Sequence, residues 1–155
     1  MKRSAGFTLI ELVIVIIILG ILAVTAAPKF LNLRGDARES TLKGMKAAME
    51  SASSLVYSKA VIQGTEGSNR GSTKINSSTT VITAYGYPQA ISTELEKVIA
   101  LSSNDWKWGT ATSGAIPLYP AGVLSSTSTC YVEYKQPTAS GSRPTISIPS
   151  TAVCD

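Results

Sequence analysis

The pattern of hydrophobic and polar positions divides the chain into three parts. From Phe7 to Ala27 the apolar residues are interrupted only by two threonines, one glutamate and one glycine. A run of about 20 apolar residues is long enough to cross a bilayer as a helix. Lys2 and Arg3 precede the run, so the positive-inside rule places the N-terminus in the cytoplasm and the rest of the chain across the membrane. We therefore predict a membrane-spanning helix over residues 7–28.

After Pro28 the pattern becomes amphipathic. Apolar residues recur every three or four positions, as on one face of a helix, and charged residues fill the other face. The helix is expected to end just before Gly64. A coiled coil is the alternative for residues 29–62, but Gly35 and Gly44 interrupt it and no heptad repeat is sustained. The apolar positions are Leu42, Met45, Met49, Ala52 and Val56, with Leu55 beside them.

The third part, residues 63–155, is predicted to be a small globular head. Residues 63–78 are rich in Gly, Ser, Thr and Asn and lack the glycine spacing of a nucleotide-binding loop, so a surface loop is expected. Valine, isoleucine and threonine predict β-strands at 79–85, 129–135 and 145–148. Prolines border the last of these, which is therefore expected at a sheet edge.

A short helix is predicted from Pro88 or Thr93 to Leu101, with Thr93 and Glu96 as its capping box. Together these elements predict an α+β fold. The apolar half of a long N-terminal helix would protrude, and its amphipathic half would pack on a small antiparallel β-sheet.

Composition limits the chemistry that this chain can perform. It has 155 residues, two cysteines and no histidine. A Ser-His-Asp triad, a Cys-His pair, an imidazole metal site and a four-thiolate zinc site are therefore excluded. The acids are scattered and no basic patch is dense enough for nucleic acid. We expect no enzyme, metal, cofactor or nucleic-acid partner. Trp106 and Trp108 could form a carbohydrate platform, although core packing is the commoner role in a small head.

The N-terminal run could also be a secretory signal peptide. It is longer than the roughly 7–15 residues of such a core, and Pro28 stands beside any cleavage point that would follow it. Glu11 counts most against this alternative. A carboxylate within an apolar span costs about 1–3 kcal/mol, depending on its depth, and suggests a function that requires it.

The sequence Gly6-Phe7-Thr8-Leu9-Ile10-Glu11 and the apolar run after it resemble the class III signal of type IV prepilins. The basic residues before it match the short leader of the type IVa subclass. This resemblance implies that a membrane prepilin peptidase removes residues 1–6 by cutting between Gly6 and Phe7, and that the new Phe7 amine is N-methylated. The long helix is similar to that of the family. The head looks closest to a major pilin of the mannose-sensitive haemagglutinin type.

After cleavage, Glu11 is expected to pair with a Phe7 amine. Positions four apart share a helix face, so the Phe7 of the same chain is within reach. In a staggered stack of parallel helices, Glu11 could instead reach the Phe7 amine of a neighbouring subunit. Either pairing favours both ionised forms. The family resemblance favours the neighbouring subunit, where the pair would set the register during filament growth.

Gly20 and Pro28 are predicted weak points of the helix. Pro28 could simply end the membrane helix. Alternatively, the segment between the two residues uncoils in the fibre. Eight residues passing from helical to extended backbone would lengthen each subunit by roughly 14 Å, which would let a filament stretch.

Cys130 and Cys154 would lie in an oxidising compartment, where a disulfide is expected and two free thiols are the alternative. In type IVa pilins a C-terminal disulfide bounds a surface-exposed region in which subunit contacts and adhesion vary. Residues 130–154 resemble that region.

These features predict the major structural subunit of a type IV pilus for attachment, haemagglutination and biofilm formation. A minor pilin and a pseudopilin of type II secretion are the alternatives, but the scattered acids offer no calcium loop of the pseudopilin kind. The implied partners are copies of this chain, the prepilin peptidase, an inner-membrane assembly platform, and host or abiotic surfaces including glycans. The precursor would lie in the inner membrane of a Gram-negative bacterium, and the fibre outside the cell.

Overall fold

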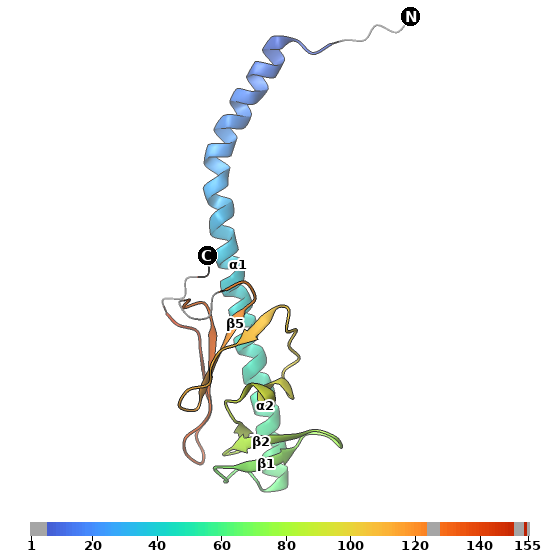
Figure 1. Ribbon diagram of the computed structural model, residues 1–155, viewed down its shortest axis with the longest axis vertical. Helices are drawn as coiled ribbons and strands as arrows, with labels where there is room; N and C mark the ends of the chain where they lie inside the picture. The colour runs from blue at the N-terminus through green and yellow to red at the C-terminus, as the bar shows by residue number, and fades with distance from the viewer. Residues whose placement is uncertain (1–5, 124–127, 151–153, 155) are drawn as a thin grey trace, which may run out of the picture.

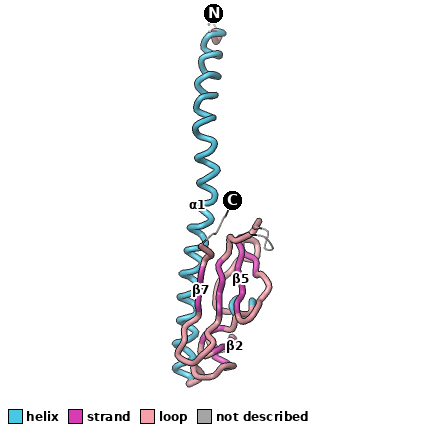
Figure 2. The backbone as a smooth tube through the Cα atoms, turned by 90° about the vertical axis from the view of Figure 1, so that its left-hand side faces the viewer, coloured by secondary structure: helices cyan, strands magenta, loops and turns pink. Residues whose placement is uncertain are grey.

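A computed structural model describes residues 6–123, 128–150 and 154 of the chain. One long helix, α1 (Leu9–Gln63), forms the axis of the molecule. The first half of α1 extends away from everything else, and the head is attached along its second half (Figures 1 and 2). This α+β arrangement confirms the predicted fold class, including the protruding apolar half.

Both ends of α1 are capped. Thr8 is the N-cap residue, and Gly64 is the C-cap with a left-handed backbone, φ 67°, which glycine adopts without strain. The helix therefore ends where Gly64 predicted. Between Gly20 and Pro28 the helix is continuous, and its first half follows a smooth curve in Figure 1. Uncoiling of this segment in a fibre remains a prediction.

The strands of the head form two antiparallel sheets. The first has the order β1-β2-β3 and the second the order β4-β5-β6-β7, so β7 lies at an edge, as its bordering prolines predicted. A short helix, α2 (Ser92–Glu96), connects the two sheets. The strands are β1 (Gly71–Lys74), β2 (Thr80–Ala84), β3 (Tyr87–Pro88), β4 (Trp106–Trp108), β5 (Ala115–Pro120), β6 (Val132–Lys135) and β7 (Thr145–Ser147).

The prediction of a loop over residues 63–78 was wrong in its second half, where β1 lies. This strand pairs with β2, from Gly71 opposite Thr83 to Lys74 opposite Thr80. Its outer edge is covered in part by the Gln63 side chain, whose amide donates to the Lys74 carbonyl at 2.8 Å and accepts from the Lys74 N–H at 2.9 Å. The strand depends on these distant partners rather than on the β-propensity of its own residues.

The predicted capping box of Thr93 and Glu96 was also wrong, because α2 begins at Ser92 and ends at Glu96, short of Leu101. Its N-cap, Ile91, makes no side-chain capping bond. The buried carboxylate of Glu94 instead accepts the Ile82 N–H at 2.7 Å, beyond the end of the short strand β3. It also pairs with Lys97 at 2.8 Å. Glu94 thus ties α2 to the open side of β2.

The core lies between the second half of α1 and the sheets. The predicted apolar stripe of α1 packs into it, with Leu42, Met49 and Val56 at most 1% exposed. Leu55, which was expected beside this stripe, faces outward and is 66% exposed. The packing of α1 against the head replaces the coiled-coil alternative. The main cluster comprises Leu42, Met49, Ala52, Ala90, Leu95, Ile99, Ile116, Leu118, Cys130, Val132, Tyr134, Ile146 and Cys154.

Tyr134 of β6 is fully buried, and its hydroxyl donates to the carbonyl of Pro88 in β3 at 2.7 Å. This bond joins the two sheets. Burial raises the pKa of Tyr134 far above its ordinary value, and the nearby Tyr87 raises it further.

We predict that the free energy of unfolding falls as the pH rises above about 10, the pKa of an unfolded tyrosine. Below that pH both states keep the proton, and above it only the unfolded state loses it. Tyr134→Phe should cost about 1 kcal/mol at neutral pH, because it leaves the Pro88 carbonyl unpaired, and should make the alkaline loss shallower. Denaturant titrations between pH 7 and 11 measure both effects. An equally steep alkaline loss in the variant would contradict the role given to Tyr134.

Candidate functional site

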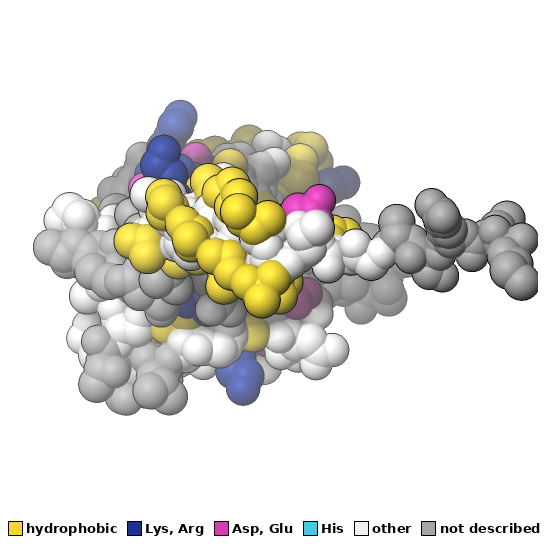
Figure 3. Space-filling view, turned by 90° about the horizontal axis from the view of Figure 1, so that it is seen from above, with side chains coloured by type: hydrophobic (Ala, Val, Ile, Leu, Met, Phe, Trp, Pro, Cys, Tyr) yellow, Lys and Arg dark blue, Asp and Glu magenta, His cyan; other side chains and the backbone are white. Residues whose placement is uncertain are grey.

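The protruding half of α1 is the largest apolar surface of the described chain. Residues Leu9–Ala27 form a helix that is long and apolar enough to cross a membrane, and the chain buries none of this segment. Figure 3 looks down on this end and shows hydrophobic side chains gathered over it. A surface of this extent requires lipid or other protein to cover it.

Glu11 lies at the start of this surface and forms a capping box with Thr8. The Glu11 carboxylate accepts the Thr8 N–H at 2.8 Å and the Thr8 hydroxyl at 2.6 Å. In return, the Thr8 hydroxyl oxygen accepts the Glu11 N–H at 3.3 Å. Sequence reasoning missed this box, although Thr8-Leu9-Ile10-Glu11 has the T-x-x-E signature that was sought only in the head.

The expected cleavage residues, Gly6 and Phe7, precede α1 and lie outside regular secondary structure. The Phe7 side chain is 94% exposed. Phe7 follows Gly6 through a peptide bond here, so the Phe7 nitrogen is an amide and cannot form the ion pair that is expected with Glu11. Of the predicted leader, residues 1–6, only Gly6 lies within the described residues.

Gly20 lies further along the same helix, beside a shallow apolar hollow of about 420 Å³. A Cβ atom at Gly20 would meet nothing within 4 Å. Packing within the single chain therefore does not require glycine at this position. The Thr25 hydroxyl donates to the carbonyls of Ile21 and Leu22, at 3.3 and 3.1 Å, and so is satisfied within the helix. The hollow is lined by Ile16, Ile17, Gly20, Ile21, Val24 and Thr25.

The predicted disulfide joins Cys130 and Cys154, whose Cα atoms are 5.0 Å apart. Both cysteines belong to the buried core. Arg38 of α1 donates from Nη1 to the Cys154 carbonyl at 2.9 Å. The disulfide therefore joins the end of the chain to the segment before β6, and the hydrogen bond joins it to α1. Sequence reasoning did not identify Arg38, because the contact joins residues 116 positions apart.

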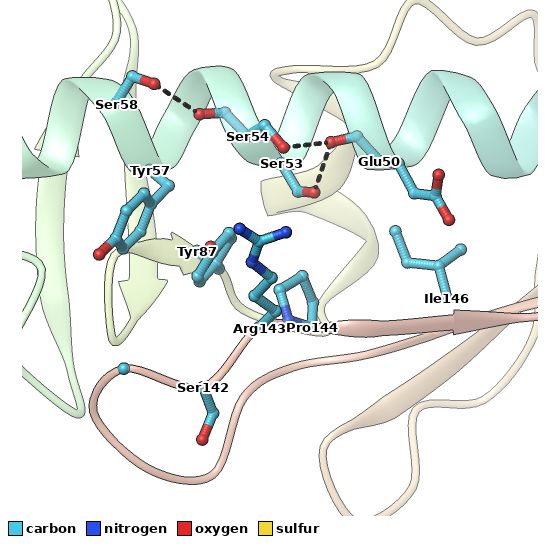
Figure 4. Close-up of a pocket in the computed structure, with 11 residues that line it drawn as sticks. Glu50, Ser53, Ser54, Tyr57, Ser58, Tyr87, Ser142, Arg143, Pro144 and Ile146 are labelled. Carbon is cyan, nitrogen blue, oxygen red and sulfur yellow. Dashed lines mark hydrogen bonds between the residues drawn. The ribbon is translucent and has the colours of Figure 1, made fainter.

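A polar groove of about 670 Å³ runs between α1 and the turn before β7 (Figure 4). Tyr57 of α1 and Tyr87 of β3 stack beside it, with ring centroids 4.5 Å apart. The Arg143 side chain points from the turn toward α1, and it makes no hydrogen bond or ion pair with another described residue. The groove is lined by Glu50, Ser53, Ser54, Tyr57, Ser58, Tyr87, Gly141, Ser142, Arg143, Pro144 and Ile146.

Other candidate chemistry in the described part of the chain is sparse. Trp106 and Trp108 both pack, half-buried, against the core cluster, which is the packing role that was expected. Among the described residues no group of three or more acids and cysteines is placed to hold a metal ion.

Comparison with known proteins agrees with the N-terminal features. Residues 1–27 match the prokaryotic N-terminal methylation motif. The chain is 44% identical over 61 residues to the type IV narrow pilus major component PilA5 of Thermus thermophilus, across 39% of this chain and 49% of that protein. Its N-terminal region is therefore similar to that of a type IV pilin. A second relative, the type IV major pilin protein PilA of Myxococcus xanthus, is 40% identical over 57 residues, across 37% of this chain and 26% of PilA.

These matches cover only part of this chain and of each relative. The chain spans about half the length of the first relative and about a quarter of the second. No solved structure matches the chain. The similarity is to structural subunits of type IV pili rather than to enzymes, in accord with the expectation that this chain has no catalytic activity.

Proposed function

We propose that this chain is the major structural subunit of a type IV pilus. The observation that supports this most directly is the uncovered apolar half of α1, with an acid at its start and a methylation motif spanning it. The capping box with Thr8 gives Glu11 a role within its own helix, but it leaves the carboxylate of an apolar span without a cationic partner. A bundle of copies would both cover the apolar surface and supply the carboxylate with a cationic partner.

The N-terminal residues and the apolar half of α1 also account for the proposed assembly. A prepilin peptidase cuts between Gly6 and Phe7, the Phe7 amine is N-methylated, and residues 7–28 hold the precursor in the membrane. An assembly platform in the inner membrane of a Gram-negative cell then adds the subunit to a growing fibre. Glu11 of the incoming subunit pairs with the Phe7 amine of a neighbour, which neutralises both charges inside the apolar bundle.

Outside the cell the fibre would serve in attachment to host or abiotic surfaces, haemagglutination and biofilm formation. The mannose-sensitive haemagglutinin subtype is part of this proposal. A minor pilin is the second candidate, since it would share the apolar helix. A secretion pseudopilin is less favoured because the head is closed by a disulfide and, within the described residues, has no acidic cluster for calcium.

The test is to image cell-surface fibres of a strain that lacks this chain. A major subunit predicts that fibres are absent and that re-expression restores them. Fibres of normal number and length in the deleted strain would refute the assignment as major subunit. A deleted strain that makes only a few fibres of normal length would indicate that the chain is needed for initiation alone. That result would favour the minor-pilin alternative.

The polar groove is our candidate for saccharide contact during attachment. The guanidinium of Arg143 can donate hydrogen bonds to sugar hydroxyls, and the carboxylate of Glu50 can accept them. The charges of these two side chains cancel. Tyr57 adds an aromatic ring to the lining of the groove.

We predict that Arg143→Gln lowers the binding of purified fibres to an array of immobilised saccharides by about tenfold, the effect of one lost charged hydrogen bond. Arg70→Gln, which changes an exposed arginine that does not line the groove, is the matched control and should bind normally. Equal binding by all three fibres, or no binding by the wild type, would exclude this groove as the contact site.

A further inference from the structure

The helix begins immediately beyond the bond that processing must break. Gly6, Phe7 and Thr8 precede α1, and Thr8 has an extended backbone with φ −81° and ψ 150°. The first described i to i−4 hydrogen bond of α1 runs from the Leu12 N–H to the Thr8 carbonyl at 3.3 Å. The Gly6–Phe7 bond is thus one residue removed from the N-cap.

We propose that Thr8 is a positioning residue for cleavage, a role that rests on the proposed processing of this chain. Its capping box with Glu11 fixes the start of α1 at Leu9 and keeps the Gly6–Phe7 bond in non-helical backbone. A peptidase must reach the carbonyl carbon of that bond and bind the backbone on both sides of it. A non-helical segment offers its C=O groups for such binding, whereas the C=O groups in the first turn of a helix already accept hydrogen bonds from the N–H groups four residues on.

Three hydrogen bonds make this N-cap strong. The backbone N–H and the hydroxyl of Thr8 both donate to one carboxylate oxygen of Glu11. The Thr8 hydroxyl oxygen accepts the backbone N–H of Glu11, which has no carbonyl partner within the helix. Within a membrane little water is present to replace these hydrogen bonds, so their loss costs more free energy than it would on a helix in water. The cap is therefore well placed to decide where α1 begins.

The sequence upstream shows what would happen without this cap. The nearest preceding residue of the type that caps helices well is Ser4. A helix that began after Ser4 would enclose Gly6 and Phe7 in its first turn and withdraw the scissile bond from the peptidase. Gly6 opposes this extension, because glycine is a poor helix former, and so acts in the same direction as Thr8.

The role of Thr8 can be separated from that of Glu11. The hydroxyl of Thr8 accepts the backbone N–H of residue 11, which remains when the Glu11 side chain is replaced. Replacement of Glu11 removes the two bonds to its carboxylate but leaves this one, so it should slow cleavage less than replacement of Thr8 does, while harming assembly. Replacement of Thr8 should harm cleavage itself.

The experiment measures the rate at which the full-length chain, inserted in membrane vesicles that contain the prepilin peptidase, loses residues 1–6. The variants are Thr8→Val, which keeps the branched shape without the hydroxyl, and Thr8→Ser and Thr8→Asn, which retain an N-cap. We expect Thr8→Val to slow cleavage by about 3- to 30-fold, the effect of a lost N-cap, and both capping variants to remain within about threefold of wild type.

Three results would overturn this inference. Normal cleavage of Thr8→Val would show that the cap does not matter. Rescue by serine but not by asparagine would point to recognition of the hydroxyl by the peptidase, not to capping. Slowed cleavage of Thr8→Val with unchanged hydrogen-exchange protection of the Ile10 amide, which would donate to the Gly6 carbonyl in a longer helix, would show that the helix had not lengthened. In contrast, a wild-type chain that is not cleaved at Gly6–Phe7 would refute the proposed function itself.

Discussion

Glu11→Ala is expected to be inserted into the membrane and cleaved, yet to yield at least about tenfold fewer fibres. The variant leaves the Phe7 amine of each neighbour without a counter-charge inside an apolar bundle. An uncompensated buried charge costs several kcal/mol, and every 1.4 kcal/mol changes an equilibrium about tenfold. Glu11→Val should behave in the same way. Sheared-fibre yield is the measurement, with the processed fraction of membrane-bound chain determined in parallel.

Glu39→Gln is the matched control for this experiment. Glu39 is an exposed glutamate of the same helix, and it pairs with Lys43 at 2.7 Å on the protein surface. Such a pair contributes at most about 1 kcal/mol, so fibre yield should remain close to wild type. If Glu11→Ala is processed normally and assembles normally, Glu11 is not the assembly residue.

Loss of the Cys130–Cys154 disulfide is expected to have the largest effect on the stability of the head. The sequence separation of 24 residues corresponds to about 3–4 kcal/mol in the chain-entropy model. Cys154→Ser should therefore lower the free energy of unfolding by that amount. The fluorescence of Trp106 and Trp108, which pack against the core, can follow denaturation of the detergent-solubilised chain.

Reduction of the wild-type disulfide should reproduce most of the effect of Cys154→Ser. Arg38→Gln offers a graded comparison, because it removes only the hydrogen bond to the Cys154 carbonyl and should cost about 1–3 kcal/mol. A Cys154→Ser chain within about 0.5 kcal/mol of wild type would mean that the tail is held by other contacts.

Much of the fold follows from local sequence pattern. The long helix was predicted because its apolar half is continuous, its second half is periodic, and Gly64 supplies a left-handed C-cap. The strand around Val132 was predicted because Cys130, Val132 and Tyr134 alternate with more exposed residues, and all three are buried. Each of these patterns lies within one continuous segment of sequence, so each can be recognised without knowledge of the residues that pack against it.

The missed strands depend on distant partners. β1 forms because β2 and the Gln63 side chain satisfy its backbone. β5 contains two prolines, which normally argue against a strand, but Pro120 ends it and Pro117 lies beyond the last residue of β4 with which β5 pairs. Neither condition can be read from the segment alone.

The candidate site was predicted in part. Gly6, Phe7 and Glu11 were proposed because six contiguous residues resemble a known signal, and their roles stay predictions. The Cys130–Cys154 disulfide was predicted from the compartment that the membrane segment implies, and it is confirmed. Thr8 was overlooked although its signature is local. Arg38 and the groove beside Arg143 could not be found, because they arise only when α1 and the C-terminal turn come together.

The mass of the subunit in fibres sheared from cells tests the central proposal most directly. We expect an intact mass that lacks residues 1–6 and carries one additional methyl group, and a fragment that assigns the methyl to the Phe7 amine. The mass should also be lower by two hydrogens than that of the reduced chain, as the Cys130–Cys154 disulfide requires. A fibre whose subunits retain residues 1–6, or a fibre without this chain, would contradict the proposal.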